Sequence, residues 1–180
     1  MSDLNTRCLE AFPEWLKSLP TDATELVAVL EDTAVAEPVR KHAASALNYL
    51  FKSLDLIPDG IEDLGFLDDA FVLRVASKLA LTKLAGGEGP AILSRLAPDS
   101  ALIEELLGEH YPRLERYVDG LLHAAARGRT TDELVESEEA RGAFIAELRA
   151  WASGYQTPGF AKDEKNIVKL QSFLSAKLPS

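Results

Sequence analysis

The chain has 180 residues, of which 47% are hydrophobic, and it carries a formal net charge of -10 with a pI of about 4.8. This composition predicts a soluble globular protein with a substantial core, and the negative charge disfavours binding to nucleic-acid phosphates or anionic lipids. Cys8 is the only cysteine, which excludes an intramolecular disulfide and a cysteine-based zinc site.

The sequence contains no pattern of a membrane span or a leader. No uncharged apolar stretch reaches the roughly 18 residues that a spanning helix needs. The N-terminal stretch MSDLNTRCLEAFPEWL lacks a basic region followed by an apolar one, as a signal peptide would have. We therefore expect a cytoplasmic protein with no transmembrane segment and no nucleic-acid partner.

Helical spacing of apolar residues recurs along nearly the whole chain, whereas no segment sustains the two-residue alternation of a strand. The prediction is an all-α, compact multi-helix bundle of about seven to nine helices, given ordinary helix lengths. We expect a single domain over residues 1–180.

Prolines punctuate the first part of the chain. The first amphipathic helix should be interrupted near Pro13 and stopped by Pro20, because proline lacks the backbone N–H that a helix interior uses. Asp22 followed by Glu25 resembles a capping box, which predicts the start of a second helix. A third helix is expected over residues 37–51, with Pro38 tolerated in its first turn.

An acidic loop, defined as residues 53–65, follows this helix. Pro58 should end any preceding helix, and Gly60 and Gly65 permit tight turns. The next helix should start near Gly65 and carry one apolar stripe, with Arg74 and Ser77 off that stripe.

A glycine-rich break at residues 86–90 marks a possible subdomain boundary, with a helical extension over residues 91–180. Further helices are expected there, including one over about residues 112–126, and residues 154–159 should form a linker. Candidate N-terminal caps of the later helices are Asp99, Thr130 with Glu133, Ser137 and Asp163.

One dense motif stands at the centre of this pattern. Asp55-Leu56-Ile57-Pro58-Asp59 is followed by Gly65-Phe66-Leu67-Asp68-Asp69. With these two submotifs the chain resembles the YkvA-like family, a bacterial domain of unknown function, over roughly residues 39–81. The resemblance implies a helix–acidic loop–helix hairpin and carries over no chemistry. Because some relatives look membrane-associated, it also implies a peripheral membrane role as one alternative.

The carboxylates of the motif have two interpretations. Asp55, Asp59, Asp68 and Asp69 could converge on a hard cation such as Mg²⁺ or Ca²⁺, which takes several oxygen ligands. The same residues could instead accept backbone N–H bonds in turns and in the first turn of a helix. We favour the capping interpretation, since it needs no metal.

The rest of the sequence shows no recognisable set of catalytic residues. His42, His110 and His123 do not have a metal-ligand spacing such as H-E-x-x-H. The sequence therefore favours a non-enzymatic module for protein interaction or scaffolding, with a protein partner or a second copy of the chain. The alternatives are a divalent-metal-binding protein or metal-dependent hydrolase built on the four aspartates, and a peripheral membrane protein.

Overall fold

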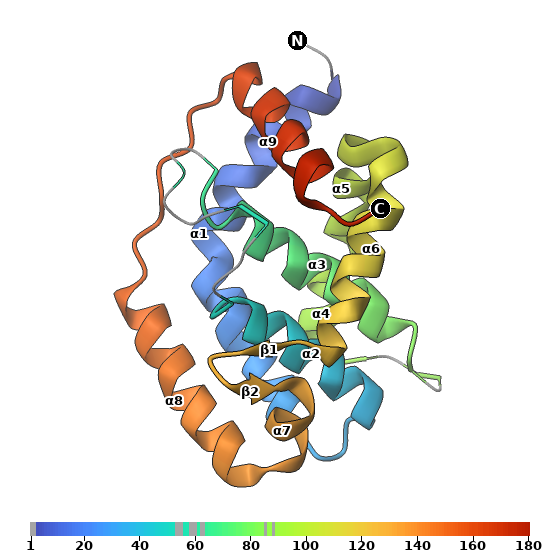
Figure 1. Ribbon diagram of the computed structural model, residues 1–180, viewed down its shortest axis with the longest axis vertical. Helices are drawn as coiled ribbons and strands as arrows, with labels where there is room; N and C mark the ends of the chain where they lie inside the picture. The colour runs from blue at the N-terminus through green and yellow to red at the C-terminus, as the bar shows by residue number, and fades with distance from the viewer. Residues whose placement is uncertain (1–2, 53–55, 58–60, 62–63, 85, 88) are drawn as a thin grey trace.

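The computed structural model describes residues 3–52, 56–57, 61, 64–84, 86–87 and 89–180. It confirms the all-α prediction: helices pack around one another on all sides of a central helix, α3 (Figure 1). No helix in these ranges is both long enough and apolar enough to cross a bilayer.

The regular elements follow one another closely along the chain. The α-helices are α1 (Asp3–Glu31), α2 (Glu37–Tyr49), α3 (Leu67–Leu81), α4 (Ala91–Leu96), α5 (Ser100–Leu107), α6 (Tyr111–Gly120), α7 (Thr131–Glu136), α8 (Glu138–Gly154) and α9 (Glu164–Lys177). Short 3₁₀ turns are η1 (Ala97–Asp99), η2 (Gly108–His110) and η3 (Leu121–His123), and the two strands are β1 (Ala125–Ala126) and β2 (Arg129–Thr130).

The first helix runs through both prolines, so the predicted stop at Pro20 and restart at Asp22 are wrong. Pro20 has no N–H to donate to the carbonyl of Leu16, four residues earlier. The hydroxyl of Tyr155 donates to that carbonyl instead, at 2.7 Å. A residue 139 positions away in the sequence thus compensates for the proline.

Three of the predicted caps in the C-terminal half are confirmed. Thr130 accepts a bond from the Glu133 amide at 3.2 Å, Ser137 from Ala140 at 3.1 Å, and Asp163 from Lys165 at 2.9 Å. Each satisfies an amide that has no partner within its own helix.

A small antiparallel hairpin replaces the end of the helix expected over residues 112–126. Ala125 pairs with Thr130 and Ala126 with Arg129. The two turn residues, Arg127 and Gly128, have φ angles of 50° and 77°, as the tightest hairpin turns require. The helical prediction is wrong here because α6 ends at Gly120 and the chain reverses at this turn.

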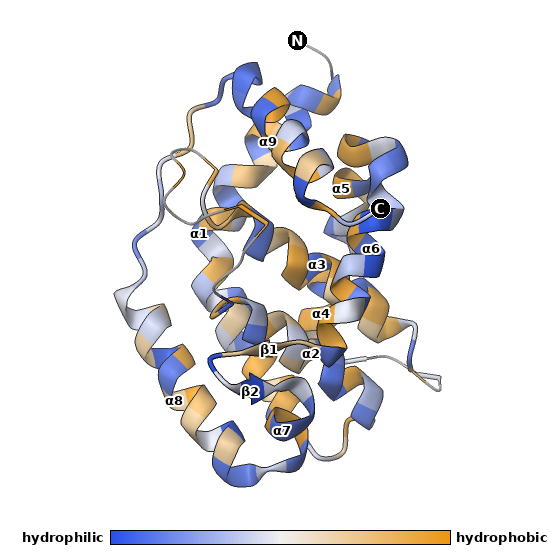
Figure 2. Ribbon diagram, in the orientation of Figure 1, coloured by the Kyte–Doolittle hydropathy of each residue, from blue (hydrophilic) through white to orange (hydrophobic). Residues whose placement is uncertain are grey.

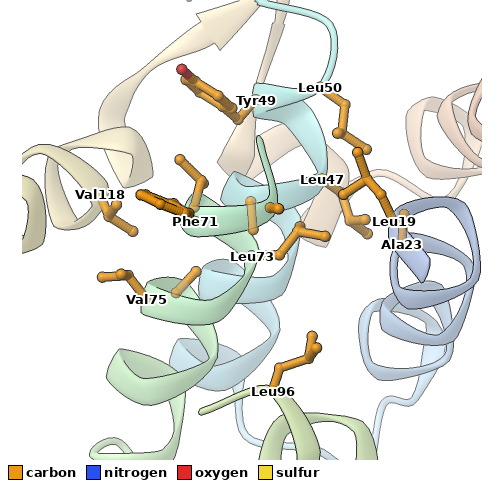
Figure 3. Close-up of a cluster of buried hydrophobic side chains, with 14 of the residues drawn as sticks. Leu19, Ala23, Leu47, Tyr49, Leu50, Phe71, Leu73, Val75, Leu96 and Val118 are labelled. Atoms are coloured by element: carbon orange, nitrogen blue, oxygen red, sulfur yellow. The ribbon is translucent and has the colours of Figure 1, made fainter. Parts of the chain in front are cut away.

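Helix α3 is the centre of the core. It packs against α1, α2, α4, α5 and α6, and most of its residues are hydrophobic (Figure 2). Its side chains Phe71, Leu73 and Val75 lie among residues from the surrounding helices (Figure 3). One hydrophobic cluster runs from Cys8 in α1 to Leu178 after α9.

Because α3 is surrounded, the prediction that Arg74 and Ser77 lie away from its buried stripe is wrong. Arg74 is 2% exposed and Ser77 is 1% exposed. The Ser77 hydroxyl donates to the Leu73 carbonyl at 2.7 Å, which satisfies it inside the core.

The buried guanidinium of Arg74 joins three elements. It donates to the carboxylates of Asp22 at 3.5 Å and Asp99 at 3.0 Å, and to the Ala70 carbonyl at 3.1 Å. Its centre lies 4.3 Å from the Trp15 ring centroid, in a cation–π arrangement. Burial lowers the pKa of Arg74, whereas the two carboxylates oppose that shift.

This network explains a second wrong cap. Asp99 precedes α5 as predicted, but its side chain makes no cap hydrogen bond and binds Arg74 instead. Asp22 is fully buried and also accepts bonds from Ser18 and Arg95, both at 2.8 Å. Both aspartates compensate the buried charge and cap no helix.

Arg113 of α6 binds the end of the last helix. Its guanidinium donates to the carbonyls of Ser175 and Pro179 at 3.0 Å and to that of Leu178. These carbonyls belong to the end of α9 and the residues after it, where carbonyls have no helical partner. Arg113 therefore fixes the last helix against α6.

Replacing Arg74 by Met should destabilise the fold by about 3–5 kcal/mol, because the fully buried Asp22 carboxylate loses its buried cationic partner and keeps the half-exposed Arg95. Arg74→Lys should restore little, since lysine lacks the planar fork that reaches two carboxylates. Urea unfolding followed by circular dichroism measures both. Arg7→Met is the matched control, because Arg7 binds Asp3 and Glu105 on the exposed surface. A loss for Arg74→Met as small as that for Arg7→Met would contradict this role.

Candidate functional site

The acidic motif lies between α2 and α3. Two of its four candidate ligands, Asp55 and Asp59, fall outside the described residues. Asp68 and Asp69 lie in the first turn of α3, where the capping interpretation placed them. Asp68 is 0% and Asp69 is 2% exposed, so these two carboxylates face the interior and not solvent.

Asp68 is bonded to segments outside its own helix. Its Oδ2 accepts a 2.6 Å bond from the Tyr49 hydroxyl and a 3.3 Å bond from the Ile57 amide. The Tyr49 hydroxyl in turn accepts a 2.8 Å bond from the Leu56 amide. We call these four residues the Tyr49–Asp68 brace. It joins the last residue of α2, two backbone amides of the acidic loop and the first turn of α3.

The brace depends on a protonated tyrosine. Burial raises the pKa of Tyr49 well above its usual range, and the neighbouring Asp68 carboxylate raises it further. The hydroxyl therefore keeps its proton and can donate to Asp68 while accepting from Leu56. A perpendicular contact with Tyr117, at 6.2 Å between ring centroids, fixes the orientation of the ring.

Helix α3 begins at an unusual backbone conformation. Phe66, the residue before the helix, has a φ of 69° in the left-handed region, which residues with a side chain seldom adopt. Its ring packs edge-on against Tyr155 at 5.5 Å. The residue that bonds the Leu16 carbonyl of α1 therefore also holds the start of α3 in place.

A second buried arginine, Arg40, links α2 to the end of α1. Arg40 donates from Nε at 3.0 Å and from Nη2 at 2.8 Å to the Leu30 carbonyl. That carbonyl lies in the last turn of α1, where helical partners are lacking. Helical spacing could not indicate this role, because the bond depends on how the two helices cross.

The structure leaves the metal interpretation untested. Among the residues described, no group of three or more His, Cys, Asp or Glu side chains is placed to hold an ion. The structure brings Asp68 and Asp69 together at the start of α3, and the other two candidates lie outside the described ranges. Binding of Mg²⁺ or Ca²⁺ by the four aspartates remains a prediction.

The histidines are dispersed over the fold. His42 is buried in α2, and burial lowers its pKa, so its imidazole is neutral near pH 7. His110 contacts the Arg113 guanidinium at 2.8 Å, and His123 is exposed in η3. Within the described ranges, none of the three lies in a cluster of metal-ligating residues.

Comparison with known proteins agrees with the position of the motif. Residues 40–74 match a family described as a protein of unknown function (DUF1232). No curated protein matches the chain. No solved structure matches it either. The matched segment starts at Arg40, contains Tyr49 and Asp68, and ends at Arg74. It therefore includes four of the residues whose side chains connect α1, α2 and α3.

Removal of the Tyr49 hydroxyl should destabilise the fold. Tyr49→Phe takes a hydrogen-bond donor from the Asp68 carboxylate and an acceptor from the Leu56 amide. This should cost about 1–3 kcal/mol because both groups are buried. Tyr111→Phe is the matched control, since the Tyr111 hydroxyl bonds to two partly exposed side chains, Lys78 at 3.3 Å and Glu115. Equal losses of unfolding free energy for the two variants would contradict the brace.

The metal interpretation has a direct test. Thermal unfolding is measured with and without Mg²⁺ or Ca²⁺ for the native chain and for Asp55→Asn/Asp59→Asn. A cation at 100 times its Kd should stabilise the native chain by roughly 2.7 kcal/mol. If the aspartates have a structural role alone, we expect no change in melting temperature with either cation. Stabilisation that the double variant abolishes would establish a metal site.

Proposed function

We propose that this chain is a non-enzymatic helical module that binds a protein partner, and that its acidic motif maintains the fold and takes no part in chemistry. The observation that carries the proposal is the complete burial of Asp68 together with its bonds to Tyr49 and to the Ile57 amide. A carboxylate held in this way is already used as a structural acceptor.

The two buried arginines of the matched segment support the same interpretation. Arg40 is directed to the end of α1, and Arg74 to Asp22 and Asp99. These side chains use their charges inside the molecule, where each is paired or hydrogen-bonded. Partner recognition is thereby assigned to the outer helices, which the central hairpin supports.

The two submotifs, residues 55–59 and 65–69, support a more specific family for the matched segment. We infer that the segment matching the family of unknown function is of the YkvA-like type, with the helical hairpin at residues 39–81 as its structural unit. The helices after residue 91, together with α1, then distinguish this chain and supply its binding surfaces.

The proposal is tested by identifying and reconstituting a complex. A photo-crosslinking amino acid placed at exposed positions of α1, α8 and α9 in living cells covalently traps neighbours, and each trapped protein is then purified and titrated against the chain by calorimetry. We expect a saturable 1:1 complex, or a dimer in analytical ultracentrifugation if the partner is a second copy.

The brace variant separates binding from chemistry. Below its melting temperature, Tyr49→Phe should bind the reconstituted partner with unchanged Kd, because the brace lies inside the fold. Metal-dependent hydrolysis by the purified chain that is lost in Asp68→Asn would overturn the proposal, as would the absence of any reconstituted complex.

A further inference from the structure

A groove on the surface of the bundle lies where the end of α1 approaches the start of α4. It has a volume of about 310 Å³, which is at the lower end of the size of ligand pockets in proteins. We call it the α1–α4 groove. Its lining residues are Glu25, Ala28, Val29, Asp32, Val35, Pro90, Ala91 and Ile92.

The floor of this groove is apolar and firmly held. Val29 and Ile92 belong to the hydrophobic core, at 2% and 7% exposure. Ala28 and Ala91 are exposed along the groove, and their short side chains leave room for a larger group from outside. A bulky apolar side chain placed there would be removed from water against the apolar side chains of the floor.

The charged residues that line the groove are all acidic. Asp32 is exposed, and its Oδ1 accepts a bond from the Ala34 amide at 2.9 Å. Glu25 binds Arg95 through Oε2 at 2.9 Å, while Arg95 itself does not line the groove. The net charge of -10 adds a negative field over the whole molecule. Such a field attracts cationic partners and speeds their association.

A second groove provides the contrast. It lies between α5 and α9, has a volume of about 270 Å³ and is lined by Leu106, Leu107, His110, Val168, Gln171, Ser172 and Ser175. It contains no carboxylate, although Val168 is 61% exposed within it. The two grooves are similar in size and differ in charge, so the acidic rim distinguishes the first.

We propose that the α1–α4 groove binds a segment of a partner protein that carries a bulky apolar side chain flanked by lysine or arginine. This inference rests on the proposed function and specifies the surface and the chemistry of the partner. The apolar side chain occupies the space over Ala28 and Ala91, and the flanking cations lie near Asp32 and Glu25. Opposite charge at the rim selects the partner, and apolar burial supplies most of the affinity.

The test is selection from a phage-displayed library of random peptides, with the native chain as bait. We expect enriched peptides in which an apolar residue lies beside Lys or Arg, and binding should perturb the NMR amide signals of Val29 and Ile92. Raising NaCl from about 0.05 M to about 0.5 M should weaken binding, because salt screens exposed charges.

Three variants locate the site. Ala28→Arg fills the groove and adds a positive charge at an exposed helical position, where arginine is well tolerated; we expect the affinity of the selected peptides to fall by about tenfold or more. Asp32→Asn, which keeps an acceptor for the Ala34 amide and removes the charge, should weaken binding by a few fold. Val168→Arg, at the α5–α9 groove, is the matched control and should leave the affinity unchanged.

The possible outcomes separate the groove from the proposed function. The groove proposal is contradicted if the selected peptides lack basic residues, or if they bind the Ala28→Arg variant with normal affinity. Either result leaves the proposed protein-binding function intact. If the chain forms a dimer and Ala28→Arg dissociates it, a second copy of the chain occupies the groove. That result contradicts a basic segment of a partner as the occupant. Failure to select any peptide, together with failure to reconstitute any complex, overturns both proposals.

Discussion

The structure depends on one buried charge. Arg74 lies on the central helix, out of contact with bulk water, and its guanidinium is compensated by Asp22 of α1, by Asp99 before α5 and by the face of Trp15. Burial of a guanidinium costs desolvation free energy, which these partners offset. The charge therefore fixes the positions of α1, α3 and the α4–α5 junction relative to one another.

The acidic motif likewise places a buried charged group, Asp68 in the first turn of α3, where hydrogen bonds satisfy it. Its carboxylates suggest a cation site when they are considered as a sequence, since five aspartates lie between residues 55 and 69. In three dimensions, Asp68 accepts from a tyrosine and from a loop amide, and the bonds run to different segments. The matched segment, residues 40–74, contains Arg40, Asp68 and Arg74, whose side chains all bond to other groups inside the molecule.

Local patterns predicted the parts of the fold that local interactions determine. The all-α class, the start of α2 at Glu37–Pro38 and the caps Thr130, Ser137 and Asp163 depend on residues a few positions apart, so the sequence sufficed. The predictions at Pro20 and Asp22 were wrong because distant residues decide both positions. Tyr155, which bonds the Leu16 carbonyl that Pro20 leaves without a donor, lies 139 positions from Leu16. Arg74, which binds Asp22, lies 52 positions from it. The brace was missed for the same reason: nothing in the spacing of Tyr49 and Asp68 indicates that their side chains meet.

Hydrogen exchange at the Leu56 and Ile57 amides tests the central claim that the motif is an internal brace. Outside regular secondary structure, such amides exchange rapidly unless a buried partner holds them. The account predicts that both exchange slowly in the native chain, and that in Tyr49→Phe the Leu56 amide loses its protection while amides in the middle of α1 keep theirs. Exchange of both amides in the native chain at the rate of an unstructured peptide would contradict the brace, and with it the assignment of the acidic motif to the scaffold.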